Sequence, residues 1–351
     1  MKDAARPYMT LEDLANTPSI PATEEIPLAL QNMLNRDSEV YIRSKSKPKL
    51  DFTIEEVHGA PGIWRVVNSS ADEELLTIIP GQQQTQMDIK ELATADVGVA
   101  STDGYRPPWV PLDYLPRLVP FRVDNGIAFE PRAVEETRRL NYPFRTVGLV
   151  RGPGGKGTGV LVGPNLMLTA GHLAPWGMSP WHMEFIPAFR AGDPRPPFGN
   201  SFVEAYRGWN TQPEVSGYDY VVCKLFNPLG RALGWMGTVS FGNENEYYRR
   251  RYVSSGYPGS FGNRPAVELD MGLRDIDSDS PGLELEFSHA GFPHIRGGWS
   301  GGPLWLPAEG PAVAGICSGA EKDEFDPTFI VFAGGKGMVD LVKWAQVNFP
   351  A

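Results

Sequence analysis

Ser300 lies in the glycine-rich segment 297–303, GGWSGGP, and its surroundings could make it a nucleophile. A serine hydroxyl attacks poorly at neutral pH unless a neighbouring base takes its proton and hydrogen-bond donors stabilise the oxyanion that forms. Glycines on both sides let the backbone turn tightly, so the N–H groups of Gly298 and Ser300 could converge on one oxygen. The motif alone fits an ordinary glycine-rich turn equally well, and other residues must decide.

The histidines limit the order in which a base could join Ser300. The spacing Gly298-x-Ser300-x-Gly302 also fits the nucleophile turn of α/β-hydrolases, which place their histidine after the serine. No histidine of this chain follows Ser300, and this excludes that order. The order His, Asp, Ser remains, together with the order Asp, His, Ser. The five histidines are His58, His172, His182, His289 and His294.

His172 and Asp219 are the base and the acid that the sequence offers. The run 166–172, LMLTAGH, predicts a buried strand that ends in two small residues, which would place the His172 imidazole at a cleft. Asp219 stands near the head of the apolar run 217–225, GYDYVVCKL, which predicts another strand. A buried aspartate is costly without a partner, and the Nδ1–H group of His172 would satisfy it and fix the tautomer. The three residues predict acyl transfer through a serine.

Composition favours a β-rich protein with sizeable cores. The chain has 351 residues, of which 41% are hydrophobic, and it contains 39 glycines and 33 prolines. Short apolar runs between so many turn residues are typical of all-β proteins rather than of long helices. The predicted strands in the second part of the chain are 146–151, 158–162, 166–169, 218–225, 251–255, 283–287, 302–306, 312–316 and 328–332, and a helix is predicted over 337–347.

Charge and cysteine content exclude several classes. The net charge is −10 without a basic stripe, which argues against nucleic acid and anionic membranes as partners. No apolar run is long enough for a transmembrane helix. Cys223 and Cys317 are too few for a disulfide-stapled scaffold and are predicted to be reduced, buried thiols. The start of the chain lacks the apolar region of a secretory signal, so we expect a protein that stays in the cell or one whose signal was removed.

The chain divides into an N-terminal extension, 1–124, and a second domain, 125–351. In the extension, a short helix is expected over 28–34 and strands over 39–42, 62–67 and 75–79. The proline-rich stretch 81–125 is predicted to be an irregular linker or strap.

Three segments resemble the motifs of the trypsin/chymotrypsin superfamily of serine proteases. They are 169–172 (TAGH), 218–222 (YDYVV) and 298–303 (GWSGGP), in the order His, Asp, Ser. Segments 142–148 (YPFRTVG) and 255–259 (SGYPG) are similar to the glutamyl endopeptidase branch. The resemblance covers about residues 126–350. It implies two six-stranded β-barrels, with the active site between them, and a C-terminal helix.

The resemblance also implies roles for single residues. His172 would be general base and then acid, Asp219 would orient it, and Ser300 would attack a peptide carbonyl. Gly298 and Ser300 would donate the oxyanion hole, and Ser318 would line the substrate and brace Asp219. The predicted substrate-binding residues are His294, Ile295, Cys317, Ser318 and Gly319.

The residues at the expected specificity pocket differ from those of the glutamate-selective members. Those members place a histidine where this chain has Cys317, and serine or threonine where it has Ile295. His294 falls at the base of the expected pocket, with Arg296 nearby, so we expect a preference for acidic or polar side chains rather than for Lys or Arg. Cys317 is predicted to be a small wall residue, and a redox gate is the alternative.

The sequence predicts a serine endopeptidase that acts on polypeptides without a cofactor. His182, His289 and His294 show no metal-ligand spacing. Residues 1 to about 124 could be a propeptide that inhibits the enzyme until a cut near 124–126, and a permanent accessory domain is the alternative. A catalytically silent protease fold that binds peptides, and an esterase on the same fold, are the competing functions.

Overall fold

A computed structural model describes the chain over most of its second part. Side chains are described for 99–113, 138–152, 155–178, 181–191, 196–210, 215–278, 282–292, 295–307, 310–321 and 329–351, and the backbone alone for 19–21, 52–57, 64–68, 73–78, 83–86, 132–133 and 279. The chain divides into two units, 1–82 with 177–182, and 83–176 with 183–351.

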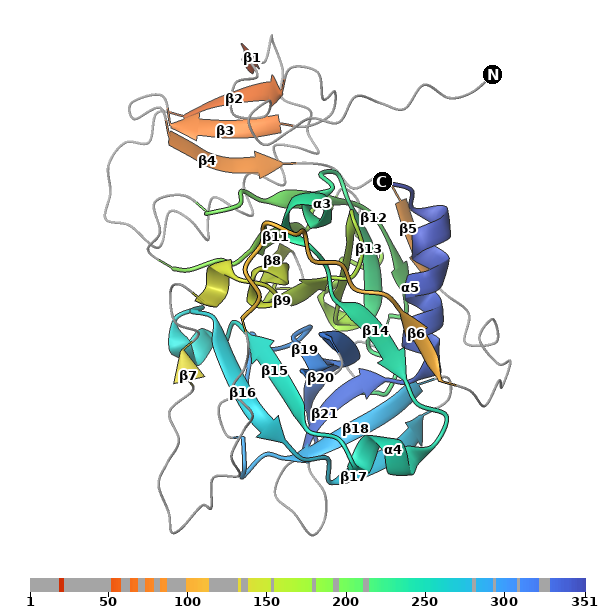
Figure 1. The fold of residues 1–351 in the computed structure, drawn as a ribbon. Coiled ribbons are helices and arrows are strands. Elements are labelled where there is room, and N and C mark those ends of the chain that lie inside the picture. Colours follow the sequence, from red (N-terminus) through yellow and green to blue (C-terminus); the bar gives the residue numbers. More distant parts are fainter. Residues whose placement is uncertain are drawn as a thin grey trace. The chain divides into compact units, whose positions relative to one another are not determined.

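The first unit contains a four-stranded antiparallel sheet in the order β1-β2-β3-β4 (Figure 1). The predicted strands 62–67 and 75–79 correspond to β3 and β4, whereas the predicted helix 28–34 and strand 39–42 lie outside the described residues. The strands are β1 (Ser19–Pro21), β2 (Phe52–Val57), β3 (Trp64–Asn68) and β4 (Glu73–Ile78).

The second unit begins with a closed six-stranded antiparallel barrel. Its order is β11-β8-β9-β10-β13-β12, and the pairing of β11 with β12 closes it. β5 (Gln83–Gln86) extends this sheet by running parallel to the last four residues of β12. Alternate residues such as Val160, Leu168 and Val222 are fully buried inside. The barrel strands are β8 (Val147–Gly152), β9 (Gly155–Leu161), β10 (Leu166–Thr169), β11 (Glu184–Pro187), β12 (Ser201–Gly208) and β13 (Val221–Leu225).

A second sheet follows the barrel along the chain. Its main path is β17-β18-β21-β20-β19-β15-β16-β7, with β14 parallel to β20 and β6 antiparallel to β14. Among the described strands, no pairing of β16 with β17 or β18 closes this sheet into a second barrel. The strands are β6 (Ala100–Thr102), β7 (Arg132–Ala133), β14 (Gly237–Ser240), β15 (Tyr252–Gly256), β16 (Ala266–Met271), β17 (Asp275–Asp279), β18 (Gly282–Ser288), β19 (Pro303–Leu306), β20 (Ala312–Glu321) and β21 (Phe329–Gly334).

Helices are few, and the longest is at the C-terminus. α5 (Lys336–Asn348) packs against β6, β13 and β14, as Figure 1 shows for its place beside β6 and β14. Its apolar residues recur at helical spacing and are buried, namely Met338, Val339, Leu341, Val342 and Ala345. This confirms the predicted helix. The other described helices are α3 (Leu229–Leu233), α4 (Glu244–Tyr248) and the 3₁₀ turns η2 (Arg138–Leu140), η3 (Phe144–Thr146), η4 (Gly171–Leu173) and η5 (Gly259–Phe261).

One hydrophobic core joins the barrel, the second sheet and α5. Val160 of the barrel, Trp305 of the second sheet and Val342 of α5 belong to the same buried cluster. Both cysteines are buried free thiols, as predicted. No helix among the described residues is long and apolar enough to cross a membrane. The all-β class and the C-terminal helix are therefore confirmed.

The stretch from 99 to 113 is built into the second unit, which fits the predicted strap and not the predicted linker. Thr102 of β6 lies opposite Thr238 of β14, and their hydroxyl oxygens are 2.8 Å apart. Tyr105 and Trp235 exchange two backbone hydrogen bonds of 2.9 and 2.8 Å, with ring centroids 4.7 Å apart. Asp113 pairs with Arg138 at 3.3 Å. Sequence patterns miss this packing because β6 is only three residues long.

Candidate active site

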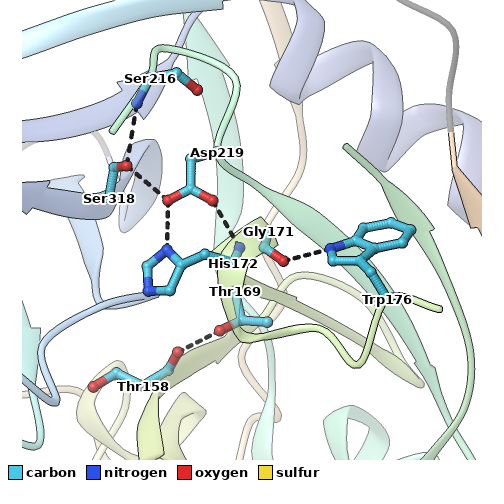
Figure 2. A network of polar contacts seen from close by, with 8 residues as sticks. All are labelled: Thr158, Thr169, Gly171, His172, Trp176, Ser216, Asp219 and Ser318. Carbon is cyan, nitrogen blue, oxygen red and sulfur yellow. Dashed lines mark hydrogen bonds and ion pairs between the residues drawn. The ribbon is translucent and has the colours of Figure 1, made fainter. Parts of the chain in front are cut away.

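His172 and Asp219 form a closely paired couple at the end of a barrel strand. β10 ends at Thr169, and the 3₁₀ turn η4 directs the His172 imidazole toward Asp219 (Figure 2). Asp219 Oδ2 lies 2.7 Å from His172 Nδ1, and Oδ1 accepts the backbone N–H of His172 at 2.8 Å. The carboxylate holds the ring and the main chain of the same residue, so the imidazole has little freedom to rotate.

Asp219 lies in a turn before β13, not on the strand predicted over 218–225. The Asp219 N–H donates to Ser216 O at 3.3 Å, and the Tyr220 N–H donates to Tyr218 O at 2.8 Å. The strand itself begins at Val221.

Ser318 supplies a further donor to the buried carboxylate. Its hydroxyl donates to Asp219 Oδ2 at 2.6 Å and accepts the Ser216 N–H at 3.4 Å (Figure 2). Asp219 is fully buried, whereas the His172 side chain is 27% exposed. A buried carboxylate is tolerated only when hydrogen bonds replace its water, and these donors provide them. The structure thus brings His172, Asp219 and Ser318 together.

Ser300 lies in a loop with a fixed backbone just before β19. Gly298 and Gly301 have φ angles of +98° and +81°, which favour glycine. A Cβ atom on Gly298 would lie 2.5 Å from Tyr257 O. The fully buried Trp299 anchors the loop to β15, because its Nε1–H donates to Ser254 Oγ at 2.9 Å.

Hydrogen bonds to two carbonyls orient the N–H groups of Gly298 and Ser300. Gly297 O accepts the Gly259 N–H at 2.9 Å, and Trp299 O accepts the Gly302 N–H at 2.7 Å. In a trans peptide the N–H points away from the preceding carbonyl. The N–H groups of Gly298 and Ser300 therefore point away from the carbonyls of Gly297 and Trp299. Within the described part of the chain, neither N–H group donates to an acceptor.

The Ser300 loop packs on the segment that leads to His172. A Cβ atom on Gly301 would lie 2.0 Å from Thr158 O and 3.0 Å from the backbone nitrogen of Ala170, two residues before His172. The Thr158 N–H donates to Ser300 O at 2.7 Å. Residues 131 to 143 positions apart in the chain thus meet at one place.

The predicted substrate-binding residues have different surroundings. Ile295 and Cys317 are each 3% exposed and belong to the same core cluster as Trp299. Gly319 is half-buried, and a Cβ atom on it would lie 2.8 Å from a methyl group of Val215. His294 lies outside the described residues. Their role in substrate binding stays a prediction.

The Cys223 and Cys317 thiols should not react in the folded protein. Burial raises the pKa of both thiols, and the charge of Asp219 raises that of Cys317 further. Because the thiolate is the reactive form, we expect iodoacetamide to modify neither residue at pH 8 and both after unfolding in guanidinium. Intact mass measures this. Rapid native modification of Cys317 would instead favour the redox gate.

Three carboxylates outside this site lie close enough to hold a cation. Ligand atoms of Asp277, Glu284 and Glu286, on β17 and β18, lie within 4.8 Å of one another. None of the three takes part in the contacts of His172 and Asp219 described above. Acidic groups at a sheet surface are common without an ion, and we assign none.

Similarity to known proteins is found among solved structures and not among family models or curated sequences. No protein-family model and no curated protein matches the sequence. Among solved structures, the chain is similar to a Glu endopeptidase in complex with MPD, with 17% identity and a TM-score of 0.45 over 59% of this chain and 92% of that chain. The chain resembles solved proteases.

Two further solved proteases match at similarly low identity and over a similar share of the chain. The protease Anisep from Arthrobacter nicotinovorans matches with 18% identity and a TM-score of 0.42, over 58% of this chain and 96% of that one. The thermostable serine protease AL20 from an extremophilic microorganism matches with 19% identity and a TM-score of 0.45, over 58% and 97%. At these identities and TM-scores, the likenesses say nothing about the residues of the site.

Proposed function

We propose that the chain is a serine endopeptidase in which His172, Asp219 and Ser300 form the catalytic triad. The 2.7 Å contact between His172 Nδ1 and Asp219 Oδ2 carries the proposal. It assigns the Nδ1 proton to the Asp219 side and leaves Nε2 as the proton acceptor. The loop of Ser300, which packs beside Ala170, supplies the hydroxyl.

The first half of the reaction forms an acyl-enzyme. His172 Nε2 takes the proton of Ser300 Oγ while Oγ attacks the peptide carbonyl carbon. The carbonyl oxygen becomes an oxyanion, which accepts hydrogen bonds from the N–H groups of Gly298 and Ser300. Protonated His172 then gives its proton to the leaving amine, and the C–N bond breaks. Asp219 stabilises the imidazolium throughout.

The second half hydrolyses the ester. Water attacks the acyl carbon as His172 Nε2 takes one of its protons, and the same two N–H groups stabilise the second oxyanion. His172 returns the proton to Ser300 Oγ, which releases the carboxylic acid product. The enzyme is then ready for another turnover.

The charges near the loop are consistent with an acidic or polar side chain at the cleaved bond. Arg296 is exposed on the loop, and burial together with the charge of Arg296 lowers the pKa of His289. With its pKa lowered, His289 stays neutral near pH 7, so the positive charge on this loop is that of Arg296, which would disfavour Lys and Arg in a substrate.

A peptide library tests the function and its specificity together. Full-length protein and protein cut near residue 124 are incubated with peptides of varied sequence, and the new termini are identified by mass spectrometry. Cleavage after acidic or polar residues is expected. Peptide binding without any cleavage, before and after the cut, would favour the silent protease fold.

The N-terminal extension should stay attached if the chain is cut near 124–126. That position lies outside the described residues, and the propeptide hypothesis remains a prediction. β5 and β6 are strands of the two sheets of the second unit, and no hydrogen bond described for 83–86 or 99–113 reaches His172, Asp219 or Ser300. A fragment with so many backbone bonds should not dissociate.

A specific protease site inserted near 124–126 tests this expectation. After cleavage we expect both fragments to co-elute in native gel filtration and to separate in guanidinium. Release of the N-terminal fragment from a still folded second fragment would contradict it.

A further inference from the structure

We propose that Thr158, on β9 of the barrel, is a positioning residue that holds the oxyanion-binding backbone of the Ser300 loop in its active shape. The proposal rests on the proposed function, because it assigns a role within that reaction. Thr158 touches no reacting atom. It acts through Gly298 and Ser300, the two residues whose N–H groups would bind the oxyanion.

Thr158 binds the carbonyls of both oxyanion-hole residues. Its hydroxyl lies 2.8 Å from Gly298 O, and its backbone N–H donates to Ser300 O at 2.7 Å. The backbone N–H of Tyr257 reaches the same hydroxyl at 3.0 Å. Since an N–H group can only donate, the hydroxyl accepts from Tyr257 and gives its own proton to Gly298 O. Thr158 is fully buried, so water does not compete for these bonds.

The two bonds from Thr158 to the loop complete a set of hydrogen bonds that fixes the peptide groups around Gly298 and Ser300. The N–H of Gly298 is oriented by the bond to Gly297 O, and its carbonyl by Thr158. The N–H of Ser300 is oriented by the bond to Trp299 O, and its carbonyl also by Thr158. The peptide after Gly298 could otherwise rotate easily, because glycine has few restrictions on φ and ψ. Thr158 therefore fixes the carbonyl groups of both residues and leaves their N–H groups available for the oxyanion.

Thr158 also connects the loop to the strand that leads to His172. Thr169, the last residue of β10, donates its hydroxyl proton to Thr158 O at 2.6 Å (Figure 2). Gly157 permits the close approach, because a Cβ atom there would lie 2.8 Å from Ser300 O. One buried threonine thus links the base, through Thr169, and the nucleophile loop.

Threonine fits this place for two reasons. The bond pair needs a hydroxyl that donates and accepts, which valine lacks. A β-branched residue has a restricted χ1 and suits a strand, so the hydroxyl is held in one direction. Thr158→Val keeps the shape and the backbone N–H and removes only the two hydroxyl bonds.

The test compares Thr158→Val with Thr158→Ser, Thr158→Cys and a matched control, Thr146→Val. Thr146 is also fully buried, and its hydroxyl donates at 2.8 Å to Pro143 O, which lies directly before η3 and outside the Ser300 loop. Loss of an entire oxyanion donor costs about 10²–10³ in turnover, and loosening one should cost less, about 10-fold to 100-fold. We expect kcat to fall by that factor in Thr158→Val with KM changed less than about threefold.

The series separates positioning from simple loss of stability. kcat should decrease in the order Thr, Ser, Cys, Val, whereas Thr146→Val should lose stability with unchanged kcat. If Thr158→Val does not fold, the order of the other three decides. Unchanged kcat across the series, or a change in KM alone, would overturn the proposal.

Hydrogen exchange keeps the proposal testable if the wild-type chain cleaves nothing. Exchange of residues 295–302 is followed by mass spectrometry in all variants. Faster exchange of this loop in Thr158→Val but not in Thr146→Val is expected, whether or not the protein is active. Equal exchange in both would overturn the positioning role, and an inactive wild type with the expected exchange would refute only the proposed function.

Discussion

Ser300→Ala should lower kcat for peptide hydrolysis by about 10⁶-fold, which is the size of effect known for removal of the nucleophile from a serine protease. The substitution deletes the only atom that forms the acyl bond and leaves the loop intact. Ser300 Oγ has no hydrogen bond to another described residue, and the backbone bond between Ser300 O and the Thr158 N–H survives in alanine. The free energy of unfolding should therefore change by less than about 0.5 kcal/mol.

Initial rates on the best library peptide and denaturant unfolding measure the two effects. Ser288→Ala, which changes a half-buried serine of β18, is the matched control and should keep wild-type activity. Ser300→Ala with more than a hundredth of wild-type activity would show that another residue is the nucleophile.

Asp219→Asn should lower kcat by about 10⁴-fold, as expected when the acid of a triad can no longer fix the tautomer of the base. Asp219 accepts from the His172 ring, the His172 main chain and Ser318. An amide nitrogen in place of either oxygen would face a donor, so the ring would turn or take the wrong tautomer. An unmatched buried donor should also cost about 1–3 kcal/mol in the free energy of unfolding.

Ser318→Ala provides the graded comparison for Asp219→Asn. It removes one donor to Oδ2 and leaves both contacts with His172, so its loss of kcat should be much smaller than that of Asp219→Asn. The pair is compared by kcat and by unfolding in urea. Equal losses of kcat, or an Asp219→Asn variant with more than a tenth of wild-type activity, would contradict the assigned role of Asp219.

The sequence predicted the strands that are apolar along most of their length. The β10 range, 166–169, matches the prediction, and β18, β20 and β21 overlap their predicted ranges, because runs of buried Val, Ile and Leu leave little ambiguity. β12, β16 and β17 were not predicted. Their sequences, SFVEAYRG, AVELDM and DIDSD, mix acids with apolar residues, and only pairing with neighbouring strands makes them β structure.

The candidate site was also predicted only in part. The pairing of His172 with Asp219 followed from the cost of burying an isolated carboxylate, and the structure brings the two together. Thr158 was missed because its role depends on a contact between segments 140 residues apart, between its hydroxyl and Gly298 O. The only local signal was a threonine between Gly157 and Gly159, where the backbone comes close to another segment.

Labelling with a fluorophosphonate probe tests the central claim most directly. The probe reacts with a serine only when a base activates it and an oxyanion hole receives the phosphoryl oxygen. Full-length protein, protein cut near residue 124 and Ser300→Ala are treated alike, and the labelled peptide is mapped by mass spectrometry. We expect one label per wild-type chain, on Ser300, and none in Ser300→Ala. No labelling of either wild-type form, or a label that persists in Ser300→Ala, would contradict the account.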